Sequence, residues 1–282
     1  MVTRQSGQGV GEQPNAPEPQ LPTGIARAAA PRPPRRRPTL WMILIAAVVA
    51  LLALLVLSRR SLVEAFKVPS GAMYPSIAIG DHLFVTKSTY GIFSKSAPRR
   101  GDVVVFEYPD SDPERPRVDY IKRVIALPGD RLEVQGGVPI INGWQAPRCR
   151  VGEASVTIGI DAAQLEIFVE FLEERSYLVA QELGRRAERQ GPFVVAAGEF
   201  WVLGDNRDNS ADSRFWHAGR GAGVPFASLH GRASLVWLPA ERFGVDLNAR
   251  PALPRDLKVL QSELDRCLQT PPSVAARTPP PP

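Results

Sequence analysis

The sequence predicts a mainly β protein, with an antiparallel β-sheet domain that follows one N-terminal apolar helix. Three observations lead to this prediction. An uncharged apolar run covers residues 40–57, many short strand-like segments follow residue 80, and both ends of the chain are rich in proline. A chain of 282 residues is long enough to form one or two domains with a core.

The two ends are predicted to be disordered, because they combine many prolines with few large apolar residues. Together residues 1–38 and 269–282 contain half of the 28 prolines. The expected organisation runs in four parts: a Pro/Arg-rich tail at 1–38, a transmembrane helix at 39–60, a β domain at 61–250 with an insertion near 150–191, and a short amphipathic helix with a Pro-rich tail at 251–282.

The apolar run Leu40–Leu57 has 18 residues without a charge. At 1.5 Å per residue it would extend about 27 Å, close to the hydrocarbon thickness of a bilayer. A buried core helix would not need so many unbroken apolar positions. A cleaved signal peptide would have a shorter apolar region and a small-residue cleavage site, which is not evident after Leu57. The run therefore predicts a single membrane span.

Arginines predict the orientation of this span. Two follow it, Arg59 and Arg60, and a larger cluster precedes it: Arg27, Arg32, Arg35, Arg36 and Arg37. The positive-inside rule places the N-terminus in the cytoplasm and residues 61–282 outside. This position makes topology a better explanation of the cluster than nucleic-acid binding.

Short segments with β-branched or aromatic residues predict the strands of the domain. These are residues 82–87, 102–108, 119–127, 131–135, 138–142, 175–182, 199–204 and 233–238. The segment 161–174 fits a helix or a strand, and we assign it to the insertion. Near the end, leucines at three- and four-residue steps predict a short amphipathic helix on the domain surface: Leu257, Leu260, Leu264 and Leu268.

Two cysteines remain, Cys149 and Cys267. A disulfide is permitted outside the cytoplasm, but the two lie far apart in sequence, so we expect two unpaired thiols. No Cys/His cluster has the spacing of a zinc site, and we expect neither a metal nor a cofactor.

Three motifs dominate the domain: VPSGAMYPSIAIGD (68–81), YIKRVIALPGD (120–130) and GDNRDNSADSR (204–214). With RRGDVVVFEYP (99–109) and the preceding apolar helix, they resemble bacterial type I signal peptidase over about residues 40–240. That family comprises membrane-bound serine proteases that remove signal peptides from exported proteins. The resemblance implies a serine nucleophile with a lysine general base, signal-peptide-bearing precursors and membrane lipid as partners, and no nucleic acid.

Lys122 occupies the position of the family's general base. A lysine with an ordinary pKa of about 10.4 is protonated at pH 7 and cannot accept a proton. It must be buried among apolar groups, which disfavour the charged form. Lys122 has Tyr120, Ile121 and Val124 around it in a predicted strand. Without the resemblance, the same residue would be taken for an ordinary exposed lysine.

The third motif supplies supporting residues by resemblance. Ser210 would hydrogen-bond the Lys122 amine, and Asp212 and Arg214 would form an ion pair that holds the loop. Asp205 starts a tight turn with other side chains that bond their own backbone: Asn206, Asp208 and Asn209. A Ser-His-Asp triad is the less favoured route, since none of the three histidines lies at a nucleophile motif: His82, His217 and His230.

The chain departs from the family at one position, because Ala72 stands where the nucleophilic serine is expected. Ser70 remains, and the family uses this serine for the oxyanion hole together with a backbone N–H. If residues 68–72 are extended, positions 70 and 72 share a face and lie about 6.6–6.8 Å apart, which is too far for one lysine to serve both. Gly71 makes a rearrangement conceivable.

Three interpretations therefore stay open. Ser70 attacks with Lys122 as base; or the chain binds precursors without cutting them, for instance as strands added to its sheet; or the alanine was introduced or misread in an otherwise complete site. A self-cleaving Ser-Lys repressor is discarded, because it would carry a DNA-binding domain in place of the membrane helix.

By resemblance, the substrate cleft would be lined by Phe66, Val68, Met73, Tyr120 and Ile121, with small pockets that favour alanine. Apolar residues near 66 and 92–93 would dip into the bilayer surface.

Overall fold

The computed structural model describes residues 39–90, 96–108, 117–185 and 188–282. The chain divides into two compact units, Met1–Val49 and Ala50–Pro282. The described part of the first unit is the beginning of helix α1 (Leu40–Leu62). The predicted disordered tail at 1–38 lies outside the described residues.

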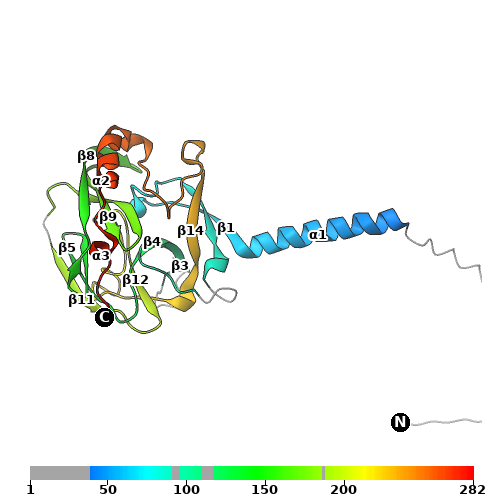
Figure 1. The fold of residues 1–282 in the computed structure, drawn as a ribbon, viewed down its shortest axis with the longest axis horizontal. Helices are drawn as coiled ribbons and strands as arrows, with labels where there is room; N and C mark the ends of the chain where they lie inside the picture. The colour runs from blue at the N-terminus through cyan, green and yellow to red at the C-terminus, as the bar shows by residue number, and fades with distance from the viewer. Residues whose placement is uncertain (1–38, 91–95, 109–116, 186–187) are drawn as a thin grey trace, which may run out of the picture. The chain divides into compact units, whose positions relative to one another are not determined.

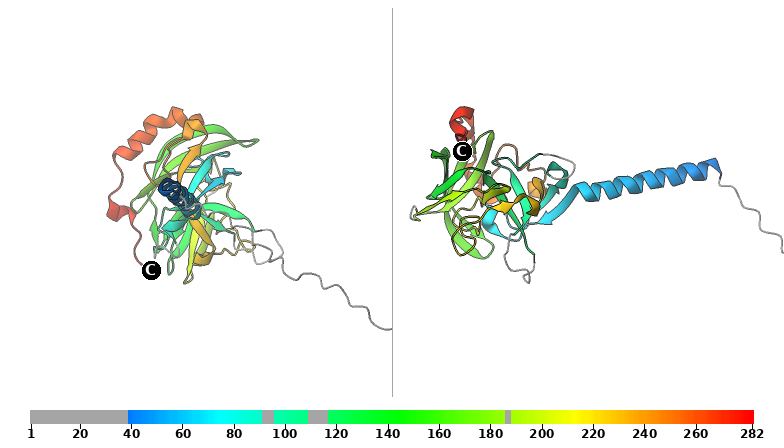
Figure 2. Two further views of the ribbon diagram at one scale, coloured as in Figure 1. Left: turned by 90° about the vertical axis from the view of Figure 1, so that its right-hand side faces the viewer. Right: turned by 90° about the horizontal axis from the view of Figure 1, so that it is seen from below.

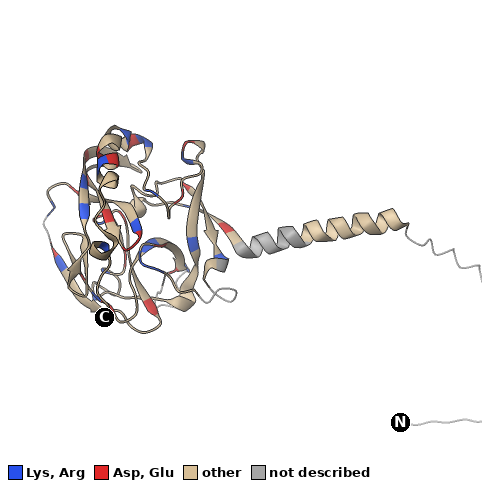
Figure 3. Cartoon of the chain, in the orientation of Figure 1, with Lys and Arg blue, Asp and Glu red and all other residues tan. Residues whose placement is uncertain are grey.

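Helix α1 contains the apolar run. Its side chains are described from Leu40 to Ala53, where all are exposed and none is charged (Figure 3). Within the part of the chain that the structure describes, no helix is long and apolar enough to cross a membrane.

The second unit is built from antiparallel sheets (Figure 1), in agreement with the predicted fold class. A seven-stranded sheet has the order β1-β2-β14-β3-β4-β12-β13, with strands at Val63–Lys67, His82–Thr86, Leu229–Leu238, Val103–Glu107, Asp119–Ala126, Glu199–Leu203 and Val224–Pro225. A three-stranded sheet has the order β10-β9-β8, at Arg175–Glu182, Asp161–Leu172 and Arg148–Ile158. A four-stranded sheet has the order β11-β5-β6-β7, at Arg189–Val194, Arg131–Gln135, Val138–Ile141 and Trp144–Gln145.

The large sheet buries apolar residues on both of its faces. In β3, Val103 and Val105 pack into one cluster with Met73, while Val104 and Phe106 pack into another. Side chains alternate between the faces of a strand, so a run such as VVVF indicates a strand that is covered on both sides. All eight segments predicted as strands overlap observed strands.

The second sheet corrects the open assignment of residues 161–174. Residues Asp161–Leu172 form strand β9, which pairs with β8 through the register Ile158↔Asp161 to Arg148↔Glu170. Alternate β9 side chains at Leu165 and Ile167 are buried, which gives a period of two and not the helical period. Most of the segment 150–191, which was predicted to be an insertion, therefore consists of a long β8–β9 hairpin and its neighbour β10.

The predicted amphipathic helix near the end is confirmed as a 3₁₀ segment, η5 (Arg255–Leu260), followed by helix α2 (Gln261–Gln269). Leu257 and Leu264 are buried against the β8–β10 sheet. In Figures 1 and 2 this segment is coloured orange to red and runs along the outside of the sheets.

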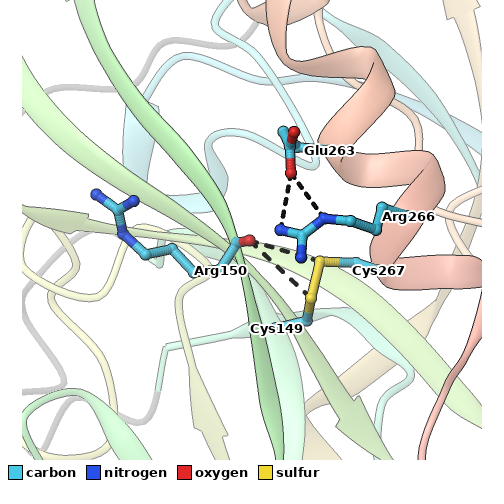
Figure 4. Close-up of a disulfide and its surroundings, with 5 residues drawn as sticks. All are labelled: Cys149, Arg150, Glu263, Arg266 and Cys267. Carbon is cyan, nitrogen blue, oxygen red and sulfur yellow. Dashed lines mark hydrogen bonds and ion pairs between the residues drawn. A yellow bond between two sulfur atoms is a disulfide. The ribbon is translucent and has the colours of Figure 1, made fainter.

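The expectation of two unpaired thiols is wrong. Cys149 on β8 and Cys267 on α2 form a disulfide, with their Cα atoms 5.7 Å apart (Figure 4). The sequence separation of 118 residues was misleading, because α2 packs directly on β8. Both cysteines contact the same apolar cluster, which brings the two sulfur atoms together.

The Pro-rich C-terminal tail is also ordered, against the prediction of disorder. It includes helix α3 (Val274–Arg277), and its backbone carbonyls accept hydrogen bonds from the sheets. The indole of Trp144 donates to the carbonyl of Ala276 at 3.2 Å, and Asn142 Nδ2 donates to that of Pro280 at 2.8 Å. Proline lacks an N–H donor but keeps its carbonyl, so such a tail can still be fixed by donors on its surroundings.

Candidate active site

The first motif forms a tight turn beside the large sheet. Ser70 is extended, with φ −128° and ψ 154°, and residues Gly71–Met73 then form the 3₁₀ turn η1. The assumption that residues 68–72 are all extended is therefore wrong. Ala72 is buried within this turn, whereas Ser70 is exposed and its side chain makes no capping hydrogen bond.

Lys122 lies on β4, which packs against the Gly71–Met73 turn. Its side chain is only 3% exposed, with Val104 directly opposite on β3 and the Tyr120 ring centroid 5.4 Å from the amine. Among the described residues, none forms a hydrogen bond or ion pair with the amine.

The environment of Lys122 lowers its pKa to about 8. Burial is the main cause, because removal from water disfavours the ammonium form. Asp212 and Asp205 act in the opposite direction, and Arg214 lowers the pKa further. A lysine with this pKa is partly neutral near physiological pH and can accept a proton.

The 204–214 loop follows strand β12, which pairs with β4, and this pairing brings the third motif to Lys122. The loop also touches the Gly71–Met73 turn. The Asn206 backbone N–H donates to the carbonyl of Ala72 at 3.1 Å, and Asn206 Nδ2 donates to the carbonyl of Gly71 at 3.3 Å.

Gly204 makes this approach possible. A Cβ at position 204 would overlap the Ser210 hydroxyl and would lie 2.5 Å from the carbonyl oxygen of Ala72. The three motifs thus meet in space around the Gly71–Met73 turn.

Asp212 and Arg214 form the predicted ion pair. Arg214 donates from Nε and from one terminal nitrogen to the two carboxylate oxygens, each at 2.8 Å. Asp212 also accepts the backbone N–H of Gly204 at 2.9 Å, and Arg214 donates to the carbonyl of Arg207 at 2.7 Å. The pair therefore closes the loop on itself.

Asp205 has a partner that the sequence did not reveal. Arg123, next to Lys122 on β4, points to the other face of the strand and binds Asp205 at 2.8 Å and 2.6 Å. Arg123 also donates to the carbonyl of Gly101 at 2.7 Å and stacks on the Tyr177 ring at 3.9 Å. The two neighbouring residues therefore lie on opposite faces of β4: Arg123 binds Asp205 on one face, and the Lys122 amine is buried on the other.

The Ser210 hydroxyl does not make the hydrogen bond to Lys122 that was predicted. Ser210 Oγ and Asn206 Oδ1 are both buried without a hydrogen-bond partner among the described residues. Buried polar atoms nearly always have a partner in folded proteins. Both atoms belong to the 204–214 loop, which contacts the Gly71–Met73 turn.

The predicted cleft residues are divided between core and surface. Val68 and Met73 are buried in the core of the large sheet. Phe66 and Ile121 are half-buried against the same cluster, and Tyr120 is half-buried on the opposite face. Residues 92–93 lie outside the described residues.

The histidines do not form a triad with a serine. His82 Nδ1 lies 3.0 Å from the carbonyl of Gly80, and His230 Nε2 lies 2.8 Å from Asp119 Oδ1. Among the described residues, no histidine hydrogen-bonds a serine hydroxyl.

The residues missed by sequence analysis at this site are mainly those that hold the Gly71–Met73 turn. The sequence analysis predicted only that Asn206 would bond within its own loop. Its position between two charged residues, Asp205 and Arg207, was the one local sign that it could also bond to another segment. Ile158, from the β8–β9 hairpin, reaches Gly71, and nothing in its local sequence indicates this contact.

Comparison with known proteins agrees with this arrangement. The family model described as signal peptidase, peptidase S26, matches residues 41–238. A signal peptidase I from Pseudomonas aeruginosa is 36% identical over 197 residues, covering 64% of this chain and 66% of that protein. The chain thus spans just under two thirds of that relative.

Other relatives are covered more fully. A signal peptidase I from Rickettsia typhi is 35% identical, with 64% of this chain and 73% of that protein covered, and one from Leptolyngbya laminosa is 32% identical, with 82% and 94% covered. A crystal structure of a signal peptidase I from Enterococcus faecalis is 23% identical and covers 49% of this chain and 97% of its own, but its TM-score of 0.28 is too low to support an inference. On the family match and these identities, the chain belongs to the signal peptidase family, peptidase S26.

Proposed function

We propose that this chain acts on signal-peptide-bearing precursor proteins at a site made by the Gly71–Met73 turn, Lys122 and the 204–214 loop. The observation that carries the proposal is the buried Lys122, whose pKa is lowered to about 8 beside the turn. An ordinary structural lysine has no need of this environment, whereas a general base does.

The reaction is peptide hydrolysis through a serine hydroxyl with Lys122 as base. The neutral amine takes the hydroxyl proton as the oxygen attacks the scissile carbonyl, and the ammonium then gives this proton to the departing amine. Water then attacks the resulting ester; Lys122 takes a proton from the water and gives it to the departing serine oxygen, which restores the hydroxyl and the neutral amine. Asp205 and Asp212 stabilise the protonated amine during each cycle. By resemblance, Ser70 and the backbone N–H of residue 72 would hold the oxyanion.

Ala72 gives this chain no hydroxyl at the position towards which these groups converge. A second function, binding of precursors without cleavage, is favoured by this single methyl group. Ser70 is the nearest remaining hydroxyl in the motif, but it precedes the turn and is exposed. We therefore propose that the chain with Ala72 is weak or inactive on ordinary precursors and that its site is otherwise complete.

The test compares three proteins on one precursor with an Ala-x-Ala cleavage site: the unaltered chain, Ala72→Ser, and Ser70→Ala. We expect strong cleavage by Ala72→Ser alone. If the unaltered chain cleaves well and Ser70→Ala abolishes the activity, then Ser70 is the nucleophile. If Ala72→Ser stays inactive, the binding function is favoured.

We also propose that residues 39–60 anchor the chain in the inner (plasma) membrane, with the N-terminus in the cytoplasm and the β domain outside. The 18 uncharged residues and the arginines before them support this orientation. The Cys149–Cys267 disulfide adds support, because such bonds persist in oxidising compartments.

Protease added to intact spheroplasts tests the orientation. It should digest or trim the region after residue 60, whereas removal of the N-terminal tail alone would mean that the topology is inverted.

A further inference from the structure

We propose that Ile158, at the end of strand β8, is a positioning residue for the reaction: it holds the Gly71–Met73 turn in place through a direct contact with Gly71. The proposal rests on the proposed function for its catalytic consequence. It assigns a role to the β8–β9 hairpin, which begins at Arg148, far from the turn in sequence.

The contact between hairpin and turn is close. A Cβ at position 71 would overlap the Cγ2 methyl of Ile158, and it would lie 3.6 Å from Ile158 Cβ and 3.8 Å from Ile79 Cδ1. The Ile158 methyl therefore occupies the volume that a side chain at position 71 would take. Gly71 is required here by this approach, since its φ is not in the left-handed region.

A second set of contacts holds the turn through its polar atoms. Asn206 donates to the carbonyls of Gly71 and Ala72, at 3.3 Å and 3.1 Å. The hydrogen bonds fix the direction of the two carbonyls, and the methyl group of Ile158 limits movement of the Gly71 Cα. Together they determine where the side chain and the N–H of residue 72 point.

The hairpin has the rigidity that this role requires. Its strands are 11 and 12 residues long and are paired to the last register position, Ile158↔Asp161. Its base is tied to α2 by the Cys149–Cys267 disulfide. Val156 and Ile158 both face the core, at 5% and 9% exposure. Ile160, two residues after the end of β8, is 96% exposed.

The position of the Gly71–Met73 turn affects the reaction rate, because a small displacement of a reacting group slows the reaction. A misplacement of about 1 Å can reduce a rate about 10²-fold. Loss of the Ile158 methyl would leave a space beside Gly71, into which the turn can move. Substrate binding would be little affected, since the contact is with the enzyme's own backbone.

Two substitutions separate the methyl contact from general packing, and both are made in the Ala72→Ser protein. Ile158→Val keeps a branched side chain with methyls at both γ positions, while Ile158→Ala removes them. We expect Ile158→Ala to lower kcat about 10- to 100-fold with KM changed less than about threefold, and Ile158→Val to retain kcat within about threefold. Val156→Ala, in the same cluster and on the same face, should lower stability without lowering kcat.

A second measurement does not depend on activity. In the unaltered chain, the amides of Tyr74 and Asn206 donate to the carbonyls of Gly71 and Ala72, so their hydrogen exchange reports on the turn. Ile158→Ala should accelerate exchange of both amides at least about tenfold relative to Val156→Ala, and Ile158→Val should not.

The outcomes are distinct. Unchanged exchange in Ile158→Ala would overturn the proposed contact role, whatever the activity, and so would an equal loss of kcat in Val156→Ala. Accelerated exchange together with an inactive Ala72→Ser protein would support the contact and overturn the proposed reaction.

Discussion

Two buried polar clusters share the 204–214 loop, and they differ in how completely their groups are paired. In the first, Glu170 accepts from Arg207 at 2.6 Å and 3.0 Å, from Arg148 at 2.7 Å and from the Tyr177 hydroxyl at 2.6 Å. Its carboxylate has partners for both oxygens. This Glu170 cluster joins the loop to the strands β8, β9 and β10.

The second cluster, around Ala72, is incomplete. In the described part of the chain, Ser210 Oγ and Asn206 Oδ1 are buried without a hydrogen-bond partner. No described residue forms a hydrogen bond or an ion pair with the Lys122 amine. A fully paired network makes a structure rigid, whereas a buried polar group without a partner costs free energy. The difference separates a cluster that holds the fold from one that belongs to the proposed site.

The electrostatics follow the same division. Burial alone would raise the pKa of Glu170, but Arg207 and Arg148 outweigh it and lower the pKa to about 2, so this carboxylate stays ionised. Burial of Lys122 is not outweighed, and its pKa falls to about 8. The fold thus stabilises a charge in one cluster and disfavours a charge in the other.

The largest expected effect comes from Lys122→Met. In the Ala72→Ser protein, we expect cleavage to fall by at least about 10²–10⁴-fold, since a general base is lost. Stability at pH 7 should rise by up to about 3 kcal/mol, because a charge no longer has to be buried. Precursor cleavage and chemical unfolding measure the two effects. Lys87→Met, at an exposed pair with Glu64, should change neither. Retained cleavage would exclude Lys122 as the base.

Glu170→Gln should break the paired cluster. It leaves Arg207 and Arg148 buried without a counter-charge, and we expect a loss of about 3–5 kcal/mol of unfolding free energy. Glu166 lies on the same strand as Glu170 and forms a partly exposed ion pair with Arg150. Glu166→Gln removes this pair and should lower the free energy of unfolding by less than about 1 kcal/mol. Because the folded pKa of Glu170 is depressed, its contribution should be complete above about pH 4.5 and decline as the pH falls towards 2. Equal losses for the two variants would contradict the division between the clusters.

The pH dependence of the rate tests the second cluster directly. Cleavage by the Ala72→Ser protein needs neutral Lys122, so kcat/KM should increase about tenfold per pH unit below pH 8 and level off above it. Stability should increase between about pH 8 and pH 10.5 for the same reason, since the unfolded chain there binds more protons than the folded one. A rate profile that is flat from about pH 6 to pH 9 would mean that another group limits the reaction.

The parts of the molecule that were predictable are those with local signals. Strands such as VVVF in β3 carry their own period, and the Asp212–Arg214 pair spans only two residues. Burial of Lys122 was predicted from the family resemblance, and its exposure of 3% agrees.

The parts that were not predictable depend on packing between distant segments. The disulfide follows from α2 lying on β8, and the ordered tail follows from donors such as Trp144 and Asn142. The contact of Ile158 with Gly71 needs the length and register of the whole hairpin, which no local pattern encodes.

The smallest expected effect separates two serines of the 204–214 loop. Ser213 is buried, and its hydroxyl accepts the Val202 N–H at 3.1 Å. Ser213→Ala leaves this buried N–H without an acceptor and should lower the free energy of unfolding by about 1–3 kcal/mol. Ser210 Oγ has no partner among the described residues, so Ser210→Ala should change stability by less than about 1 kcal/mol.

Activity should respond in the opposite order. In the Ala72→Ser protein, Ser210→Ala should lower kcat about 10-fold or more and shift the pH–rate profile, because the hydroxyl is available to orient the Lys122 amine once substrate and nucleophile are in place. Ser213→Ala should leave both kcat and the profile close to those of its parent. Unfolding curves and pH–rate profiles of the two variants test whether Ser210 contributes to the reaction and Ser213 to stability. If Ser210→Ala lost stability and kept its rate, Ser210 would belong with the Glu170 cluster as part of the fold, and the unpaired hydroxyl would no longer belong to the proposed site.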